Sequence, residues 1–400
     1  MSQAVQTIVV GAGVVGLATA RALAQLGVEV AVIEAEPRPA AHQSGHNSGV
    51  IHAGLYYEPG SLKARLCREG RAELIDLLEA RDVPHARPGK LVIAATDDQL
   101  PRLRDLHERG RANGLIDMQW LTAEALREHE PDAAGIAALA IPETGITDFT
   151  RLADGLVDEL KERGVEVRLD TRLLRVDEHG DGVQVTTTAG TWNARGLVAC
   201  AGLQADRVAR ACGVEPGITI VPFRGAYRRL AQERADRMRH LLYPVPDPEL
   251  PFLGVHVTPM IDGGVELGPT AVLAWDRHSD HEGGFCASDA LTTLGSIGAW
   301  KLFARRARTG LSGYIAAHSE RAFLHAARQL LPDLRADELV AGRSGLRAQA
   351  VDRRGRLVDD FAFVTGRRSL HVLNAPSPAA TASLAIGRHV AQRAAGALGL

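Results

Sequence analysis

The sequence predicts a mixed α/β (α+β) protein in which a discontinuous Rossmann-type dinucleotide-binding domain is interrupted by a second domain, built on a mostly antiparallel sheet plus helices. Three patterns predict it. A glycine-rich strand–turn–helix opens the chain over residues 7–26, and a strand–turn–helix returns over residues 370–390. Between them, residues 217–340 contain alternating apolar and polar stretches, which are typical of antiparallel strands. The length of 400 residues exceeds one typical core and agrees with two domains.

The first element reads Thr7-Ile-Val-Val-Gly-Ala-Gly-Val-Val-Gly16 and predicts a buried strand, a tight turn and the start of a helix. Gly11 allows the turn, Gly13 lets the backbone approach a pyrophosphate, and Gly16 lets the helix pack close to the strand. The N-terminus of such a helix offers unpaired N–H groups and a partial positive charge to phosphates. We therefore predict a dinucleotide site here.

An acidic residue follows the second predicted strand. Val28–Ile33 is a short apolar run, and Glu34 comes directly after it. A carboxylate at this position accepts hydrogen bonds from a ribose 2′-OH and disfavours a 2′-phosphate, so NADP is not expected. The alternative is an α/β turn that needs glycine only for its conformation, but the acid at this distance favours the dinucleotide site.

The chain then becomes irregular to about residue 60, and a loop of this length is usually functional. Ser61 is placed to cap the helix that follows. We expect the later elements in this order: strand 88–96, helices 97–113 and 122–128, a helix from Thr147 to about Gly164, strands 165–169, 173–177, 183–188 and 196–202, strands 226–230, 252–260 and 264–268, a polar helical segment 288–330, strand 370–373, and a helix from Ala379.

This order of elements divides the chain into five parts that alternate between two domains. We expect the dinucleotide-binding domain to consist of residues 1–86, 146–216 and 341–400. We expect the second domain, which would hold the substrate, to consist of residues 87–145 and 217–340.

Composition excludes several classes of protein. The net charge of −2 gives no reason to expect nucleic acid, and the four cysteines show no metal-ligand or CxxC spacing, so no metal is expected. No apolar run reaches the roughly 18 residues of a transmembrane helix. No basic leader precedes the first predicted strand, so a cytoplasmic protein is expected. The paired arginines, such as Arg305-Arg306, leave peripheral contact with the inner face of an anionic cell membrane open. Oligomeric state is not predicted.

The second strand–turn–helix favours FAD over NAD as the cofactor. Small residues follow the strand at the start of the predicted C-terminal helix, namely Ser377, Ala379, Ala380, Thr381 and Ser383. A second helix N-terminus suits the negative charge that develops at N1 and C2=O of a flavin on reduction. An NAD dehydrogenase of this length more often has a contiguous cofactor domain. We predict non-covalent FAD.

Long sequence blocks then point to a family. The loop His42-Gln-Ser-Gly-His-Asn-Ser-Gly-Val-Ile-His-Ala-Gly-Leu-Tyr-Tyr57, with Pro59-Gly-Ser-Leu-Lys-Ala64, resembles that of the L-2-hydroxyglutarate oxidases and dehydrogenases, which are D-amino-acid-oxidase-like FAD-dependent oxidoreductases. The resemblance extends from about residue 5 to 390. The other blocks that carry it are Pro222-Phe-Arg-Gly225, Tyr243-Pro-Val-Pro-Asp-Pro248, Pro251-Phe-Leu-Gly-Val-His256, Gly345-Leu-Arg-Ala-Gln-Ala350 and Asn374-Ala-Pro-Ser-Pro-Ala-Ala-Thr381.

The resemblance implies an activity. It implies FAD-dependent oxidation of L-2-hydroxyglutarate to 2-oxoglutarate, with hydride passing from Cα to flavin N5. Electrons would then pass to a quinone, an electron-transfer protein or oxygen. The alternative in the same fold is oxidation of another small acid, such as an amino acid, a sarcosine-like compound or glycerol 3-phosphate. A non-catalytic FAD-binding regulator is a further alternative, from a different class.

A dicarboxylic substrate needs cationic or hydrogen-bonding partners. Arg347 lies in a Gly-Leu-Arg pattern that resembles the carboxylate-binding arginine of the wider superfamily, and a bidentate arginine fixes orientation as well as charge. Its alternative is an arginine that bridges the two domains. Arg224 is a second candidate, equally consistent with a structural ion pair. Tyr56 is a candidate donor to the distal carboxylate or a residue packed against the flavin, and Gln349 is a weaker substrate contact.

The hydroxyl proton needs a base, and neutral histidine has a suitable pKa range. His52 lies in the flavin loop, and His256 lies on a strand expected to face the substrate pocket. We predict Arg347 and these two histidines as the catalytic residues, with His256 also a substrate contact. Each histidine alone is equally consistent with a structural role. His46 is less favoured because its loop should mainly hold the flavin.

The predicted cofactor contacts come from four separate segments of the chain. They are the glycine turn, the flavin loop, two predicted strand ends and the C-terminal turn. Leu174 is expected to contact the adenine by its backbone. For the C-terminal turn, the alternative is a tight connection that needs small residues for packing alone. The set is Gly11, Gly13, Gly16, Glu34, Ser44, Asn47, Ser48, Leu174, Ala201, Gly202, Pro376, Ser377, Ala379, Ala380 and Thr381.

Overall fold

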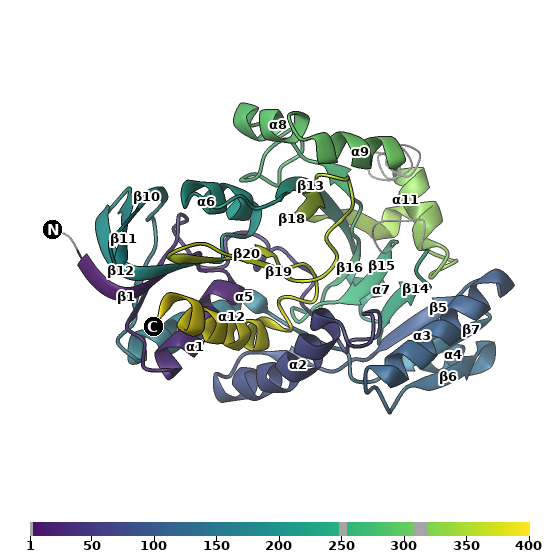
Figure 1. Ribbon diagram of the computed structural model, residues 1–400. Helices are drawn as coiled ribbons and strands as arrows, with labels where there is room; N and C mark the ends of the chain where they lie inside the picture. The colour runs from purple at the N-terminus through teal and green to yellow at the C-terminus, as the bar shows by residue number, and fades with distance from the viewer. Residues whose placement is uncertain (1–2, 248–253, 307–318) are drawn as a thin grey trace.

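The computed structural model describes residues 3–247, 254–306 and 319–400. Two large sheets lie at opposite ends of an elongated molecule, and both chain termini lie on the side of the first sheet (Figure 1). The mixed α/β class predicted from the sequence is confirmed. A small third sheet connects loops between the two large ones, and its strands are β3 (Val50–Ile51), β4 (His85–Ala86) and β8 (Gly145–Thr147).

Among the described residues, eight strands form the first sheet. Strands β12, β1, β2 and β9 run parallel in that order, β20 pairs in parallel with β12, and β10 and β11 extend β12 as an antiparallel meander. The strands are β1 (Gln3–Val10), β2 (Val30–Ile33), β9 (Glu166–Arg168), β10 (Leu173–His179), β11 (Gly182–Thr187), β12 (Gly190–Ala199), β19 (Ala362–Thr365) and β20 (Ser369–Asn374).

The parallel strands are covered on both faces. Side chains of a strand alternate between faces, so Val9 and Val32 join the cluster of α1, α5 and α12, whereas Ile8 and Ile33 join the cluster that contains α6 residues and the meander. Strands buried on both sides read as continuous apolar runs, as these do. The helices on this sheet are α1 (Val14–Gln25), α2 (Leu62–Ala80), α5 (Phe149–Glu162), α6 (Ala205–Ala211) and α12 (Ser383–Leu398).

Helix starts follow the capping residues of the sequence. Ser61 accepts a hydrogen bond from the backbone N–H of Ala64 at 3.2 Å, and Asp148 caps α5 in the same way. The predicted start of the C-terminal helix at Ala379 is wrong. Helix α12 begins at Ser383, and residues 375–382 form the connection after β20. The turn predicted to hold the flavin is therefore longer than expected, and the helix starts beyond it.

The second sheet has nine strands within the described part of the chain. Its order is β17-β13-β16-β15-β14-β5-β7-β6, with β18 paired to β13. The strands are β5 (Lys90–Ala94), β6 (Gln119–Thr122), β7 (Ala137–Ile141), β13 (Ile218–Leu230), β14 (Leu241–Pro244), β15 (His256–Pro259), β16 (Val265–Gly268), β17 (Val272–Leu273) and β18 (Leu339–Asp352).

Strand membership bears on the expected domain division. Residues 87–145 and 217–340 supply most strands of the second sheet, whereas β18 was expected in the third part of the dinucleotide-binding domain and instead pairs with β13 along its length. The domain bounds as such remain a prediction. In the expected strand 252–260, β15 covers 256–259, and residues 252–253 lie outside the described residues.

Helices pack against both faces of the second sheet. The expected helices 97–113 and 122–128 correspond to α3 (Leu100–Ala112) and α4 (Ala123–His129). The expected helical segment 288–330 contains three described helices, and its residues 307–318 lie outside the described part. Figure 1 shows α8 and α9 on the edge of the molecule beside β13. The remaining helices are α7 (Gln232–Ala235), α8 (Ala287–Leu294), α9 (Ile297–Arg305) and α11 (Glu320–Ala327).

Candidate active site

A single cavity of about 1080 Å³ brings most of the predicted site residues together. It begins at the carboxyl ends of β1, β2, β12 and β20, which meet at one edge of the first sheet, and it continues to residues of the second sheet. A crevice at this edge is where doubly wound sheets bind ligands. Of the predicted residues, all line the cavity except Arg224 and Thr381.

The glycine turn at the end of β1 has a physical requirement for each of its three glycines. Gly11 has φ +107°, and a Cβ there would lie 2.5 Å from the carbonyl oxygen of Cys200. A Cβ on Gly16 would lie 2.0 Å from the carbonyl oxygen of Gly11, so the helix can sit this close to the strand only without a side chain. A Cβ on Gly13 would instead lie 3.0 Å from Ser44 Oγ, at the wall of the cavity.

The carboxylate of Glu34 lies next to the same turn. Its carboxylate accepts hydrogen bonds from the backbone N–H of Ala12 at 2.6 Å and of Glu36 at 3.0 Å. These bonds fix the carboxylate beside the glycine turn, where the sequence predicted a ribose contact. Leu174, which is exposed, lines the cavity at this end as well.

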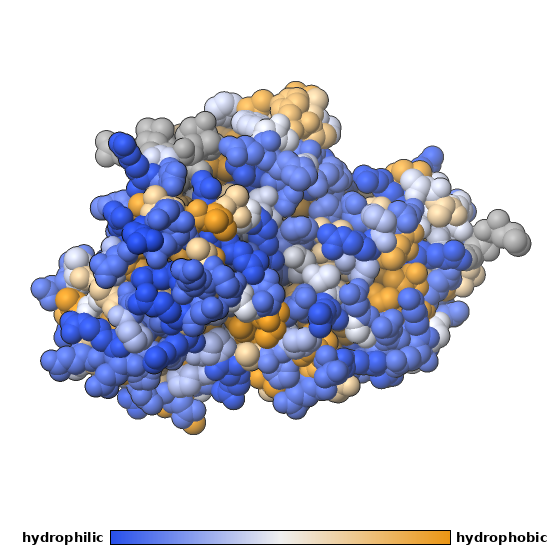
Figure 2. Space-filling model, turned by 180° about the vertical axis from the view of Figure 1, so that it is seen from behind, coloured by the Kyte–Doolittle hydropathy of each residue, from blue (hydrophilic) through white to orange (hydrophobic). Residues whose placement is uncertain are grey.

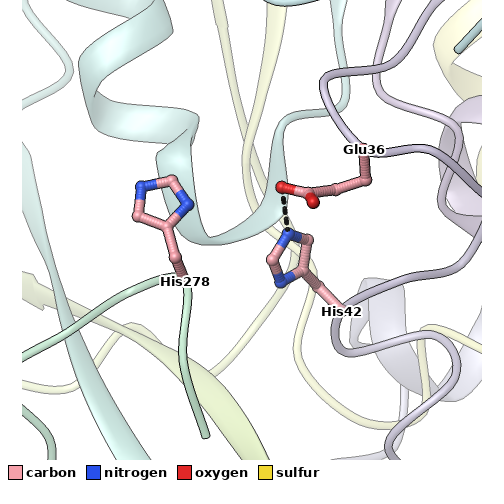
Figure 3. A group of neighbouring side chains, drawn as sticks. All are labelled: Glu36, His42 and His278. Carbon is pink, nitrogen blue, oxygen red and sulfur yellow. Dashed lines mark hydrogen bonds and ion pairs between the residues drawn. The ribbon is translucent and has the colours of Figure 1, made fainter. Parts of the chain in front are cut away.

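A second polar group lies beside Glu34 and was not predicted. His42 Nε2 is 3.1 Å from Glu36 Oε1, and the ring of His278 lies 6.3 Å from that of His42 (Figure 3). One ligand atom from each of the three residues lies within 4.8 Å of the others. His278 comes from the loop before α8, so this group joins residues 36–42 to that loop. His278 is far from the other two residues in the sequence, which is why spacing gave no sign of the group.

The flavin loop, residues 42–57, is organised largely by its own side chains. Ser44 Oγ accepts the N–H of Val14, the first residue of α1, at 3.1 Å. Asn47 donates to the carbonyl oxygens of Gln43 and Ser44 and accepts the N–H of Gly49, so its amide shapes the loop. Ser48 lines the cavity with them.

Two segments that follow strands β12 and β20 also line the crevice. Ala201 and Gly202 follow β12, and the connection after β20 lines the cavity with Pro376, Ser377, Ala379 and Ala380. Thr381 is fully buried behind them. Its hydroxyl accepts the N–H of His52 and donates to the carbonyl oxygen of Val50, so it ties the C-terminal connection to the flavin loop instead of facing the cavity.

His52 lies where these two segments meet. Its Nε2 is 3.1 Å from the hydroxyl oxygen of Ser377. Burial is the main cause that lowers the pKa of His52 to about 3, and the neighbouring charges of Lys90 and Lys63 act in the same direction. The ring is therefore neutral at physiological pH.

His256 lines the cavity from the second sheet, at the start of β15. Its ring stacks on Tyr243 with centroids 4.2 Å apart and planes at 21°. Nδ1 is 3.0 Å from the carbonyl oxygen of Gly254, so the neutral ring carries its proton on Nδ1 and has the lone pair on Nε2. Burial lowers the pKa of His256 to about 3, and Arg347 and Lys90 lower it further against the effect of the Gly254 bond.

Arg347 and Arg224 are separated by the structure. Arg347, on β18, lines the cavity. Its charge lowers the pKa of His256 and opposes the burial that raises the pKa of Tyr243. Arg224, on β13, lies 4.0 Å from Glu282 and does not line the cavity, which favours its structural alternative. Tyr56 and Gln349 line the cavity as expected.

Sequence reasoning missed two features of this end of the cavity. Tyr243 lay in a quoted family block without a role, and it is the partner of His256. Lys90 opens an apolar strand and is buried behind Tyr56 and Tyr243, with Nζ 4.4 Å and 5.1 Å from their ring centroids. A lysine at the head of the run Leu91–Ala94 was the available signal.

A third missed feature connects the elements of the two large sheets. Arg277 is fully buried and donates to both carboxylate oxygens of Asp206, at 2.7 and 3.2 Å, on α6 of the first sheet. It also donates to the carbonyl oxygens of Leu203 and Ile220. This cluster fixes the loop before α8 against the dinucleotide end of the cavity.

The residues present fit a flavin dinucleotide. At Gly13 the absence of a side chain leaves space in the crevice that a Cβ would fill. The hydrogen-bonded carboxylate of Glu34 and the N-terminus of α1 lie beside that space. The cavity continues to an end lined by histidines, tyrosines and Arg347, where a reacting ring and a small acid would meet.

Comparison with known proteins agrees with this geometry. The family model described as FAD dependent oxidoreductase matches residues 6–393. L-2-hydroxyglutarate dehydrogenase of Indibacter alkaliphilus is 42% identical over 390 residues, which cover 97% of this chain and 98% of the relative. The enzyme of that name from Escherichia coli K12 is 40% identical and covers 96% and 92%, and the mitochondrial enzyme of Homo sapiens is 37% identical and covers 96% and 87%.

Solved structures share the fold. FAD-bound L-alpha-glycerophosphate oxidase from Mycoplasma pneumoniae superposes with a TM-score of 0.80 at 22% identity, and covers 98% of this chain and 95% of its own. Glycine oxidase from Geobacillus kaustophilus superposes with a TM-score of 0.72 at 19% identity, with the same coverage. At these identities the likeness concerns the arrangement of the chain, not the substrate.

Proposed function

Because the chain belongs to the family of FAD-dependent oxidoreductases that includes the L-2-hydroxyglutarate dehydrogenases, we propose that it oxidises L-2-hydroxyglutarate to 2-oxoglutarate with FAD. The relatives of that name are 37–42% identical over nearly the whole chain, whereas the glycerophosphate and glycine oxidases are at most 22% identical. The alternative substrates, namely amino acids, sarcosine-like compounds and glycerol 3-phosphate, therefore have the weaker support.

One observation carries the proposal: the dinucleotide crevice opens into a buried pocket that combines neutral histidine with arginine. Oxidation of a 2-hydroxy acid needs a group that takes the hydroxyl proton and a cation for the carboxylate. His256 and Arg347 line the same end of the cavity and are close enough to interact electrostatically. The crevice with Glu34 and the glycine turn lies at the other end.

The chain's own residues have distinct roles in the proposed reaction. When bound, FAD supplies a two-electron oxidant for the CH–OH group. Arg347 holds a substrate carboxylate as a planar fork, which fixes the orientation of the Cα–H bond. His256 takes the hydroxyl proton on Nε2, because Nδ1 is committed to Gly254. The Tyr243 ring supports the imidazole on one face, and His52, hydrogen-bonded to Ser377, also lines the cavity.

We further infer that the electrons pass to a quinone or an electron-transfer protein, with oxygen as the alternative, and that the protein acts at the cytoplasmic face of a membrane. Within the described part of the chain, no helix is both long enough and apolar enough to cross a bilayer. Apolar side chains nevertheless gather on α8 and α9, at the top of the view in Figure 2. We define the α8–α9 patch as the exposed residues Phe285, Leu291, Leu294, Ile297 and Trp300.

This patch supports peripheral contact with an anionic membrane surface. Exposed apolar side chains that cluster in this way are typical of interaction sites, whereas scattered ones are not. Lys301 and Arg305 lie on the same helix as Ile297 and Trp300 and would meet anionic headgroups. A surface of this kind would bring the cavity close to a membrane-soluble acceptor.

Anaerobic titration of the purified protein tests the proposed function. L-2-hydroxyglutarate should bleach the visible flavin spectrum at about one equivalent per flavin, and the product should be 2-oxoglutarate. The D-enantiomer, L-lactate, D-amino acids and glycerol 3-phosphate are the controls. Bleaching by one of these controls but not by L-2-hydroxyglutarate would transfer the proposal to that substrate. A flavin that no acid bleaches would favour a non-catalytic FAD-binding protein.

A further inference from the structure

Lys90 is the one charged residue of an otherwise apolar strand, β5, and its side chain is only 2% exposed. Val92 and Ala94, on the same face of the strand, belong to an apolar cluster together with Tyr243. The ammonium group at the head of this row lies over the rings of Tyr56 and Tyr243. Both rings line the substrate end of the cavity.

A buried ammonium group needs a counter-ion. Among the residues that the structure describes, no carboxylate oxygen lies within ion-pair distance, 4.0 Å, of Lys90 Nζ. The two aromatic faces compensate part of the desolvation cost, since cation–π contacts favour the charged form. The burial cost outweighs them and lowers the pKa of Lys90 to about 7. Burial of an apolar residue at this position would cost less free energy.

The hydroxyl of Tyr56 gives an independent indication. It is buried and has no hydrogen-bond partner within the described residues, although a hydroxyl in this state normally costs free energy. The ring of the same residue is 4.4 Å from Lys90 Nζ. The unpaired hydroxyl thus belongs to a residue that lines the cavity, and the Lys90 ammonium group lies directly behind the ring of that residue.

The charges that act on Lys90 and on the two histidines of this pocket are positive, apart from the Cys67 thiol. The groups whose charges act on Lys90, His52 or His256 are one another, Lys63, Arg347 and the Cys67 thiol, and none of them is an aspartate or a glutamate. Lys63 differs from Lys90 because it donates to Asp359 at 3.0 Å. The pocket is therefore suited to a ligand that brings more than one negative charge.

We propose that Lys90 and the Tyr56 hydroxyl bind the second carboxylate of a dicarboxylic substrate, while Arg347 holds the first, so that Lys90 determines the preference for dicarboxylic over monocarboxylic 2-hydroxy acids. This inference rests on the proposed function for the identity of the acid. It does not depend on which acceptor takes the electrons.

The first test compares a dicarboxylic with a monocarboxylic ligand in the FAD-loaded protein. We expect Lys90→Met to weaken binding of 2-oxoglutarate, followed by calorimetry, roughly 10- to 100-fold, the loss typical of a charged hydrogen bond. Binding of 2-oxobutyrate, which lacks the second carboxylate, should change little. Tyr56→Phe should show a smaller loss of the same selectivity. Equal losses for both ligands, or no loss for either, would overturn the proposal.

Lys63→Met is the matched control, since Lys63 is also a buried lysine and lines the cavity, but it is paired with Asp359. It should lower stability and affect both ligands alike. A dicarboxylate-selective loss in Lys63→Met with none in Lys90→Met would assign the role to the wrong lysine and refute the proposal. If wild-type protein binds neither ligand but still binds and oxidises another acid, the proposed function fails separately.

Thermal stability distinguishes a ligand-binding lysine from one that serves packing. The folded protein holds Lys90 with a lowered pKa, so at pH 6 it carries a charge that is costly to bury. Lys90→Met removes that cost, and we expect a higher Tm at pH 6 than in the wild type, together with the weaker binding of 2-oxoglutarate. A lower Tm combined with unchanged binding would show that Lys90 serves packing.

The pH dependence of binding completes the test. A dicarboxylate binds the protonated ammonium, so the Kd of 2-oxoglutarate should rise as the pH increases above about 7, whereas that of 2-oxobutyrate should rise less. The nearby histidines, with pKa values of about 3, do not change charge in this range. Lys90→Arg keeps its charge to higher pH and should move the rise to higher pH. An identical pH profile in wild type and Lys90→Arg would contradict the proposal.

Discussion

The imidazole of His256 lies almost flat on the phenol ring of Tyr243, with ring centroids 4.2 Å apart. This contact, with the bond from Nδ1 to the Gly254 carbonyl, fixes both the plane and the tautomer of the ring. A base of fixed orientation is what proton removal from a bound hydroxyl requires. The pairing therefore distinguishes His256 from His52, whose ring nitrogen already has Ser377 as a neighbour.

The first prediction concerns the choice between these two histidines. His256→Asn should lower the rate of flavin reduction by L-2-hydroxyglutarate by about 10²- to 10⁴-fold, the usual contribution of a positioned base, with FAD retained. His52→Asn should have the smaller effect on that rate. Stopped-flow reduction under anaerobic conditions measures both. A larger loss in His52→Asn would reverse the assignment.

A second prediction concerns stability at acid pH. The pKa values of His52 and His256 are lowered to about 3 in the folded protein, from an ordinary value near 6.5. The unfolded chain therefore binds more protons than the folded chain between these values, so the free energy of unfolding decreases as the pH falls from 6.5 toward 3. The urea midpoint should be lower at pH 4.5 than at pH 7.5.

The same effect should be reduced in a variant that lacks both histidines. His52→Asn/His256→Asn keeps His371, whose pKa burial lowers to about 4, so part of the acid sensitivity should persist. The difference in urea midpoint between pH 7.5 and 4.5 should be smaller in the double variant than in the wild type. An equal difference in the two proteins would show that the histidines do not cause the acid sensitivity.

A third prediction separates the two arginines. Arg347→Lys replaces a planar fork with a point charge, and we expect KM for L-2-hydroxyglutarate to rise roughly 10-fold or more, with a smaller change in kcat. Arg224→Lys is the matched comparison on the neighbouring strand, and it should leave KM near the wild-type value because Arg224 does not line the cavity. A higher KM for Arg224→Lys than for Arg347→Lys would contradict the placement.

The two arginines also show what the sequence alone could and could not predict. Both lay in family blocks, so both were candidates. In the register of β13 and β18, Phe223 lies directly opposite Arg347, and Arg224 pairs with Leu346. Neighbouring positions of a strand project to opposite faces, so the two guanidinium groups leave the sheet in different directions. Register is a property of the paired strands and cannot be read from either segment alone.

Local patterns were predicted well because their physical causes are local. The glycine turn, Glu34 and the cap at Ser61 depend on residues a few positions apart, and the structure places them as expected. The contact of Lys90 with Tyr56 and Tyr243 joins three distant segments, so only tertiary structure reveals it. Thr381 was assigned to the flavin as a small residue at the start of the C-terminal helix. Because α12 begins only at Ser383, Thr381 lies in the connection before it and bonds to the flavin loop.

A fourth prediction concerns the glycine turn. Gly13→Val should abolish retention of FAD while the protein remains folded, because the new side chain would enter the cavity beside Ser44. Gly11→Ala should lower Tm as well, since φ is +107° and the Cβ would meet the Cys200 carbonyl. Visible flavin absorbance and thermal unfolding measure the two effects. A fully yellow Gly13→Val protein would contradict the dinucleotide site.

The final prediction concerns the α8–α9 patch. Leu291 and Ile297 are 69% and 67% exposed, so replacing both with serine should not disturb the fold. If the patch inserts into a membrane surface, each side chain contributes roughly 1.5–3 kcal/mol of apolar burial, and Leu291→Ser/Ile297→Ser should lower the fraction of protein that sediments with anionic vesicles. Ile116→Ser, at a site 86% exposed outside the patch, is the control and should sediment like the wild type. High salt should weaken vesicle binding of the wild type, because salt screens the attraction between the anionic headgroups and the charges of Lys301 and Arg305.

Equal sedimentation of the double variant and the wild type would show that the patch does not contact the membrane. That result would leave the proposed oxidation unaffected.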